Sequence, residues 1–220
     1  MADTKPTTSS QTLSRGLTAL ELLAQAEKPL TIRELSERLG LHRSITYRIV
    51  RTLADHGLVV RNESGALQLG ARLAGLARNV ARDLQAAALP ELTLIANDLR
   101  MTAFLATLDS DMDEAVTLAS VEPRHADAVV AQRPGNRHPI SLGAPGRAIR
   151  RQLTSESFER PYETSHDEVI AGLSSVAVPL AIPGQHPAAL AVVYLTGPTD
   201  IEAIGARLER GARTIHEDLS

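Results

Sequence analysis

The sequence predicts an α+β fold in two parts, a small helical domain followed by a larger domain built on a β-sheet. Apolar residues recur at helical spacing in three segments before residue 57, and a short hairpin pattern follows them. From residue 102 onward the pattern changes to short runs that are typical of β-strands. The expected divisions are a polar tail over 1–11, a first domain over 12–70, a linker helix over 71–89 and a second domain over 90–220.

The first predicted helix carries an apolar stripe. Leu13, Leu17, Leu20 and Ala24 recur at helical spacing, and the stretch 27–29 ends the helix. We expect this stripe to face the interior of the first domain.

The second predicted helix has clear start and stop signals. Thr31 and Glu34 have the spacing of a capping box, in which each side chain satisfies an amide of the helix start. Gly40 then provides a residue that tolerates the left-handed conformation found at helix ends. A third helix follows after only two residues, so the pair has the spacing of a helix-turn-helix.

The third predicted helix and the hairpin complete a winged helix-turn-helix. Ile45, Ile49 and Leu53 recur on one face of the helix and are expected to point inward. Strand-like runs over 58–61 and 66–69 flank a turn rich in Asn, Ser and Gly. The order of three helices and a hairpin is typical of this DNA-binding fold.

The outer face of the third helix has the chemistry of a DNA-reading surface. No acidic residue occurs between Glu37 and Asp55, so cations and hydroxyls can approach phosphates and base edges without repulsion. Arg43 is the preferred guanine contact, because a guanidinium binds O6 and N7 together. The predicted DNA-binding residues are Thr31, Arg33, His42, Arg43, Ser44, Thr46, Tyr47, Arg48, Arg51 and Arg61, the last on the wing. The alternative is an ordinary solvated basic face.

A further helical stripe joins the two domains. It covers 71–88, and Pro90 ends that helix or starts another. Its apolar members are Leu73, Leu76, Val80 and Leu84. They either belong to an ordinary hydrophobic core or form a dimer interface. We prefer the dimer interface, because a DNA-binding protein of this kind binds two half-sites.

The second domain alternates strands with a few helices. Strand-like runs occupy 102–109, 114–121, 126–132, 174–182 and 188–196, and helical signals occupy 145–153 and 200–219. This order predicts an antiparallel sheet with helices packed on one face.

No catalytic set or cofactor site emerges. The chain has no cysteine, which excludes disulfides, thiol nucleophiles and thiol redox sensing. A metal site from His125, Asp127 and His166 stays open as a minor alternative, although the spacing matches no common motif. The turn 143–147 lacks the Lys and the Ser or Thr of a phosphate loop, but the amide end of the following helix would suit a carboxylate ligand.

Charge is unevenly distributed along the chain. Residues 1–80 hold eleven Lys and Arg against seven Asp and Glu, whereas residues 81–220 hold twelve against nineteen. The net charge of −3 therefore combines a basic first part with an acidic second part, which is consistent with DNA binding by the first. No apolar run is long enough for a membrane span, and the polar start lacks the core of a signal peptide, so we expect a cytoplasmic protein without membrane contact.

Five longer segments resemble the IclR-type transcriptional regulators over nearly the whole chain. The amino-terminal TLSRGLTALELL and the helix-turn-helix resemble the winged domain of this family. HPISLGAPGRAI, YETSHDEVIAGLSSVAVPL and ALAVVYLTGP resemble, in the right order, the signatures of its effector domain. The resemblance implies that the protein is a dimer or a dimer of dimers and that it has a GAF-like ligand-sensing domain. It also implies control of bacterial genes, often genes for the catabolism of small organic or aromatic acids.

The resemblance also implies a set of effector-binding residues. By position these are Gly143, Ala144, Ser165, Leu173, Ser175, Tyr194 and Thr196. The stretch 153–162 is shorter than the family pattern, Ser165 and Ser175 stand where some members have an acid or a cysteine, and Tyr194 replaces a small residue. These departures suggest a smaller or differently shaped ligand.

Three functions are therefore compared. The first is a DNA-binding regulator, not an enzyme, that responds to a small effector. The second is a ligand-binding module or enzyme whose winged helix serves protein contacts, and the lack of a nucleophile–base or metal motif speaks against it. The third is a dimerisation module without a ligand.

Overall fold

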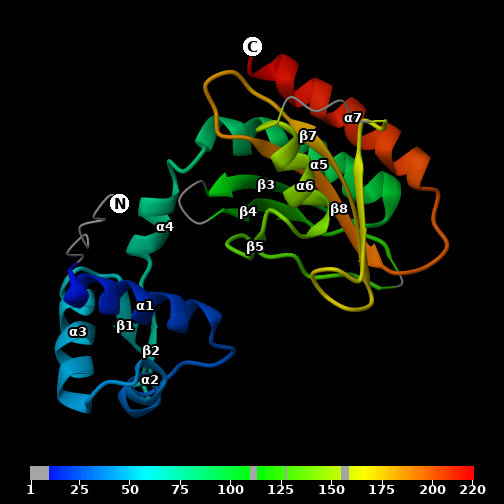
Figure 1. Ribbon diagram of the computed structural model, residues 1–220. Helices are drawn as coiled ribbons and strands as arrows, with labels where there is room; N and C mark the ends of the chain where they lie inside the picture. Colours follow the sequence, from blue (N-terminus) through cyan, green and yellow to red (C-terminus); the bar gives the residue numbers. More distant parts are fainter. Residues whose placement is uncertain (1–9, 110–112, 127, 155–158) are drawn as a thin grey trace, which may run out of the picture. The chain divides into compact units, whose positions relative to one another are not determined.

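The computed structural model describes residues 10–109, 113–126, 128–154 and 159–220, which form two units, Met1–Val80 and Ala81–Ser220 (Figure 1). The α+β fold class is confirmed, because helices dominate the first unit and an antiparallel sheet dominates the second. In the described ranges, no helix has both the length and the hydropathy that crossing a bilayer requires. Most of the expected polar tail lies outside the described residues.

The first unit follows the predicted order of elements. It contains α1 (Gln11–Gln25), α2 (Ile32–Leu39), α3 (Arg43–Asp55), β1 (Val59–Arg61), β2 (Leu67–Leu69) and α4 (Arg72–Ala77). The capping box of Thr31 and Glu34 is confirmed at the start of α2, and Gly40 ends that helix at φ 62°. Strands β1 and β2 pair antiparallel, which confirms the hairpin.

Most of the apolar stripe predicted to face inward on α1 faces outward instead, and only Leu20 of that stripe packs partly against the core. Leu13 and Leu17 are 63% and 52% exposed, whereas Gly16, Ala19 and Leu23 are buried. The helix thus carries two apolar faces, and the face with Gly16 and Ala19 packs inward because its small side chains let the other helices approach closely.

The inward face of α3 is also rotated relative to the prediction. Ile49 is buried as expected, but Ile45 is 39% exposed, and Thr46 and Val50 are buried in its place. The prediction that Thr46 points outward is therefore wrong. A spacing of four residues fixes the period of a helix but leaves the position of its buried arc open by one residue on either side.

The linker helix expected over 71–89 is not continuous. Helix α4 ends at Ala77, and α5 (Arg82–Leu99) begins after Ala81, whose φ of 44° is left-handed. Pro90 neither ends nor starts a helix but lies inside α5. The buried stripe of α5 runs past the proline without interruption, through Leu84, Ala88, Leu92 and Ile95. Burial of these four side chains outweighs the one backbone hydrogen bond that a proline cannot make.

The second unit is built on a six-stranded sheet. Its strands are β3 (Thr102–Asp109), β4 (Glu114–Val121), β5 (Arg137–Pro139), β6 (Glu163–His166), β7 (Leu173–Leu180) and β8 (Ala188–Leu195), and its other helices are α6 (Gly143–Arg151) and α7 (Ile201–Asp218). The strand order is β5-β4-β3-β8-β7-β6, and every neighbouring pair is antiparallel. β5 and β6 were not predicted, because they are short and largely polar.

Helices cover both faces of the sheet rather than one, which corrects the prediction (Figure 1). Side chains alternate along each strand, so Ala103 and Leu105 of β3 pack with α5 and α7, whereas Phe104 and Ala106 pack with α6. The face covered by α5 and α7 is the larger core.

The core between α6 and the sheet is built largely from alanine. Its alanines are Ala106, Ala115, Ala144, Ala148, Ala177, Ala189 and Ala191. Gly146 of α6 also packs closely against the segment that joins β5 to α6, because a Cβ there would lie 2.7 Å from the carbonyl oxygen of Ile140. Short side chains therefore set a close approach of α6 to the sheet.

The strand predicted over 126–132 does not form in its described part. Thr102 Oγ1 donates to the Val130 carbonyl at 2.6 Å, and Ser120 Oγ donates to the Gln132 carbonyl. Side-chain hydroxyls thus take the carbonyls that a neighbouring strand would have used.

Candidate nucleic-acid interface and effector site

The amino end of α3 is capped by a histidine side chain. His42 is the N-cap, and its Nδ1 accepts from the Ser44 amide at 3.4 Å and lies 2.9 Å from the Ser44 hydroxyl. A cap of this kind satisfies amides that would otherwise lack partners, so it fixes where the helix begins. Because the cap involves ring atoms of His42, it also orients the imidazole.

Nine of the ten predicted DNA-binding residues have exposed side chains in the first unit. They are Thr31, Arg33, His42, Arg43, Ser44, Tyr47, Arg48, Arg51 and Arg61. Thr46 is the exception, since it is 0% exposed and its Oγ1 makes no hydrogen bond with any described residue. We therefore remove Thr46 from the candidate interface.

The two residues at the start of α2 already have partners within the chain. Thr31 donates its amide and its hydroxyl to Glu34 Oε2, at 2.7 and 2.8 Å, and these two bonds lower the pKa of that carboxyl. Arg33 pairs with Glu37 at 2.9 Å. This ion pair is exposed and weak, so it leaves the guanidinium free to exchange Glu37 for a phosphate.

The wing contacts α3 through one aromatic ring. The guanidinium carbon of Arg61, the last residue of β1, lies 5.9 Å from the ring centroid of Tyr47 on α3. This distance is within the range of a cation–π interaction. Two predicted DNA-binding residues from different elements are therefore in contact with each other.

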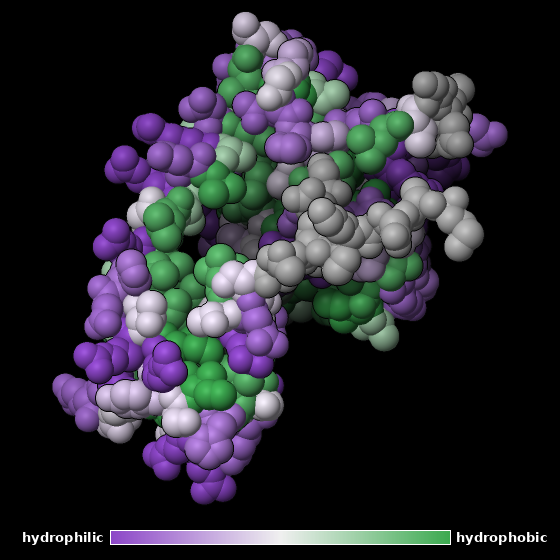
Figure 2. Space-filling view, turned by 60° about the vertical axis from the view of Figure 1, so that its left-hand side comes forward, coloured by the Kyte–Doolittle hydropathy of each residue, from purple (hydrophilic) through white to green (hydrophobic). Residues whose placement is uncertain are grey.

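The first unit also has an apolar groove beside this surface. Figure 2 shows hydrophobic residues at the surface of the unit, and a groove of about 630 Å³ runs between α1 and α3. Leu13 and Leu17 of α1 and Ile45 of α3 line it, with Arg48 also contributing. The groove is the consequence of the outward apolar faces of both helices.

The seven predicted effector-binding residues do not form a single cluster in the second unit. Leu173 and Ser175 of β7 lie on the face of the sheet covered by α6, as does Ser165, which pairs with Ser175. Gly143 and Ala144 begin α6 on that same face.

The last two predicted effector residues lie on the other face. Tyr194 belongs to the core with α5 and α7, and Thr196 Oγ1 lies 2.8 Å from the hydroxyl of Ser174, whose residue pairs with Tyr194. The expectation that Tyr194 and Thr196 complete one pocket with Gly143 is therefore wrong. The alternation of β8 places Val193, not Tyr194, toward α6.

The amino end of α6 is occupied by a carboxylate of the chain itself. The Gly143 amide donates to Glu168 Oε2 at 3.0 Å, and Arg147 donates to both oxygens of Glu168, at 2.6 and 3.0 Å. The hydrogen bond from Arg147 is the largest cause of the lowered pKa of Glu168. The sequence analysis predicted that this helix end suits a carboxylate, but it missed that Glu168 supplies one.

The side chains packed around Gly143 leave no room for a Cβ. Its φ is 71°, and a Cβ there would lie 2.9 Å from Val169 and 3.1 Å from Nε2 of His138. Burial lowers the pKa of His138 below its ordinary value. Burial of His138 beside the start of α6 therefore favours the neutral form of its imidazole.

Ser175 carries an unpaired hydroxyl on the α6 face. It is 8% exposed, and its Oγ makes no hydrogen bond with any described residue. A buried hydroxyl without a partner costs free energy, so it is a natural place for a ligand group to bind.

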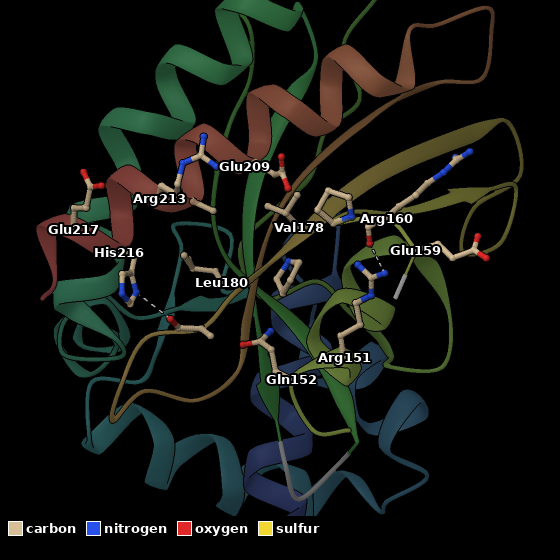
Figure 3. Close-up of a pocket in the computed structure, with 14 residues that line it drawn as sticks. Arg151, Gln152, Glu159, Arg160, Val178, Leu180, Glu209, Arg213, His216 and Glu217 are labelled. Carbon is tan, nitrogen blue, oxygen red and sulfur yellow. Dashed lines mark hydrogen bonds between the residues drawn. The ribbon is translucent and has the colours of Figure 1, made fainter. Parts of the chain in front are cut away.

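A wide groove of the second unit lies elsewhere. It has a volume of about 900 Å³ and lies between the end of α6, the end of β7 and α7 (Figure 3). His216 Nδ1 lies 3.1 Å from the Ala181 carbonyl there, and Arg151 donates to the Arg160 carbonyl at 2.6 Å. None of the predicted effector residues lines this groove.

The minor metal alternative gains no support. Among the described residues, no group of three or more His, Cys, Asp or Glu side chains is placed to hold a metal ion. Asp127, one of the three residues considered, lies outside the described residues. His166 instead pairs with Asp167 at 3.2 Å and with the hydroxyl of Ser174 at 3.1 Å.

Comparisons with known proteins agree with both units. The sequence pattern of the IclR helix-turn-helix domain matches residues 12–63. The chain is 30% identical over 153 residues to the transcriptional repressor IclR of Escherichia coli (strain K12), a match that covers 68% of this chain and 56% of that protein. It is 31% identical over 151 residues to the HTH-type transcriptional regulator Rv1719 of Mycobacterium tuberculosis, covering 68% of this chain and 57% of that protein. The matches thus span just over half the length of these relatives.

Solved structures show the same fold over both units. An IclR transcriptional regulator from Alicyclobacillus acidocaldarius is 25% identical, with a TM-score of 0.79 over 96% of this chain and 100% of that one. An IclR homologue from Microbacterium hydrocarbonoxydans, crystallised in complex with 4-hydroxybenzoate, is 22% identical, with a TM-score of 0.78 over 94% and 98% of the two chains.

Proposed function

The chain belongs to the IclR-type proteins, and on that premise we propose that it is a DNA-binding transcriptional regulator whose second unit binds a small organic acid. The relatives described above are named as regulators, and none of them is named as an enzyme. A regulator of this kind works on chromosomal DNA, in the cytoplasm.

The observation that carries the DNA-binding proposal is the exposed face of α3, which has no acidic residue before Asp55 at the end of the helix. Arg43, Tyr47 and Arg51 are exposed on a helix whose amino end is fixed by the His42 cap. In a winged helix-turn-helix such a helix enters the major groove with its amino-terminal side chains toward the bases. We assign base contact to Arg43 and phosphate contact to Arg51.

The proposal for the effector places it on the α6 face of the sheet. The unpaired Ser175 hydroxyl, with Ser165 beside it, offers hydrogen bonds to a ligand, and the surrounding alanines restrict its size. The relative from Microbacterium hydrocarbonoxydans is described as bound to 4-hydroxybenzoate, a small aromatic acid. A serine hydroxyl can donate to a ligand carboxylate, and it can both donate to and accept from a ligand hydroxyl, so serines at these positions suit a ligand with either group.

We further propose that the chain acts as a homodimer or a dimer of dimers. Helix-turn-helix proteins usually read two half-sites that lie about one turn of DNA apart, which requires two recognition helices. Leu76 of α4 and Val80, which follows it, are 63% and 52% exposed, in agreement with a surface that a partner covers, whereas Leu84 of the predicted dimer interface is buried in the core of the second unit.

Selection of bound sites from random DNA, followed by titration of single variants, tests the DNA-binding proposal. Arg43→Ala should lose sequence preference, whereas Arg51→Ala should weaken binding to all duplexes and reduce the salt dependence by about one phosphate contact. Arg38→Ala, on α2, is a matched control that should change neither. Wild-type behaviour of both α3 variants would refute the assignment.

A thermal-shift panel of small carboxylic and aromatic acids tests the effector proposal. Stabilisation of the second unit by one of these acids, lost in Ser175→Ala, would support it. Turnover of the acid without any DNA binding would favour the alternative of an enzyme or binding module whose winged helix contacts proteins. No shift with any acid would favour a dimerisation module.

A further inference from the structure

The side chain of Arg61 has one described neighbour that orients it, the ring of Tyr47. Arg61 is exposed, and no described carboxylate forms an ion pair with it. Its guanidinium lies 5.9 Å from the Tyr47 centroid, while Tyr47 itself is 49% exposed. A long, flexible cation is thus held over a ring on another element rather than left free to sample solvent.

The backbone of the wing is fixed independently of this contact. Asn62 Oδ1 accepts from the Ala66 amide at 2.9 Å and from the Ser64 hydroxyl at 2.7 Å, and the Asn62 amide donates to the Ala66 carbonyl at 2.9 Å. Gly65, at φ 79°, completes the turn. Because the turn is closed by its own bonds, the Tyr47 ring affects where the Arg61 side chain points and not whether the hairpin forms.

We propose that Tyr47 is a positioning residue that holds the Arg61 guanidinium for a phosphate of the DNA backbone. The contact of Arg61 with a DNA phosphate then depends on Tyr47, although Arg61 lies on the wing and Tyr47 lies on α3. The inference rests on the proposed DNA binding. It differs from a direct role of Tyr47, because a neutral ring or hydroxyl that touches DNA releases no counterion, whereas correct placement of a cation does.

The salt dependence of DNA affinity distinguishes a positioning role of Tyr47 from a direct contact of Tyr47 with DNA. Each phosphate neutralised by the protein contributes a slope of about 0.9 in log affinity against log salt. Arg61→Ala should therefore reduce the slope by about 0.9. Tyr47→Leu should reduce it by a comparable amount although it removes no charge, and should weaken binding about two- to fivefold, the range of an exposed cation–π contact. Tyr47→Phe keeps the ring and should keep the slope.

The assay is fluorescence anisotropy at several KCl concentrations, with the full-length protein and a duplex recovered by selection with the wild type. Amide hydrogen exchange over α3 and the hairpin checks that the variants are folded. In the double variant Tyr47→Leu/Arg61→Ala, the slope should equal that of Arg61→Ala alone. As a matched control, the double variant Tyr47→Leu/Arg51→Ala should show a reduction in slope equal to the sum of the reductions in the two single variants.

Two results would count against the inference in different ways. A wild-type slope in Tyr47→Leu, or fully additive losses in the double variant with Arg61→Ala, would overturn the positioning role and leave the proposed function intact. Absence of salt-dependent binding by the wild type to any duplex would overturn the proposed function itself, and the inference with it.

Discussion

Replacing Thr46 by valine should stabilise the first unit. Thr46 is 0% exposed on α3, and its Oγ1 has no described hydrogen-bond partner. Valine has nearly the same shape, so the change exchanges a buried hydroxyl for a methyl group without opening a cavity. The helix propensities of the two residues are close, so the backbone contributes little to the difference.

The size of the effect follows from the missing hydrogen bond. A buried polar group without a partner costs about 1–3 kcal/mol, so Thr46→Val should raise the free energy of unfolding by about 1–2 kcal/mol. For a unit of this size each kcal/mol corresponds to a rise in Tm of about 4–8 °C. DNA affinity should stay unchanged, because the side chain faces the core.

Hydrogen exchange measured by mass spectrometry on peptides of α3, together with urea denaturation, measures this stability within the intact chain. Thr52→Val is the matched control, because Thr52 is exposed and its hydroxyl donates to the Arg48 carbonyl at 3.1 Å. The control should change stability by less than about 0.5 kcal/mol. Loss of DNA affinity in Thr46→Val without a gain in stability would show that the hydroxyl faces DNA, and the reasoning would fail.

Three further predictions concern single side chains elsewhere. Leu23→Ala should cost about 2–4 kcal/mol by urea denaturation, whereas Leu17→Ala on the exposed face of the same helix should cost less than about 1 kcal/mol; equal losses would contradict the orientation of α1. The folded-state pKa of Glu168 is lowered by its arginine partner, so the stability it contributes is present above pH about 4.3 and is lost as the pH falls through the folded value. Glu168→Gln should reduce this loss of stability at acid pH, which denaturation curves recorded from pH 7 to 3 would measure. Gly205→Ala should destabilise the second unit by about 1–3 kcal/mol, because its Cβ would overlap the ring of Tyr162, and unchanged thermal unfolding would refute this packing.

Local signals in the sequence predicted the elements of the first unit well but not the faces they bury. The capping box of Thr31 and the turn at Gly40 depend on neighbouring residues only, so they can be read from the chain. The choice between the two apolar faces of α1 depends on which of them fits α3. Gly16 and Ala19 fit because they are small, a property that a search for large apolar residues overlooks.

The arrangement of the candidate effector site was also predicted incorrectly, because it depends on contacts between distant residues. The carry-over by position placed Tyr194 beside Ser175, but the register of β7 and β8 puts these two side chains on opposite faces. Glu168 was missed because its partners, Gly143 and Arg147, lie more than twenty residues earlier in the chain. Contacts over such separations depend on the sheet topology, which no local pattern encodes.

The alanine-lined core under α6 determines in which direction that helix can respond to a ligand. Each alanine methyl group contributes only about 0.8 kcal/mol, so α6 is held by many close contacts of this kind together with larger side chains such as Phe104 and Ile149. Gly146 is already in contact with the backbone of Ile140. Because short side chains separate α6 from the sheet, a substitution that enlarges one of these alanines should push the helix away from the sheet, and a ligand that enters on this face should move it in the same direction.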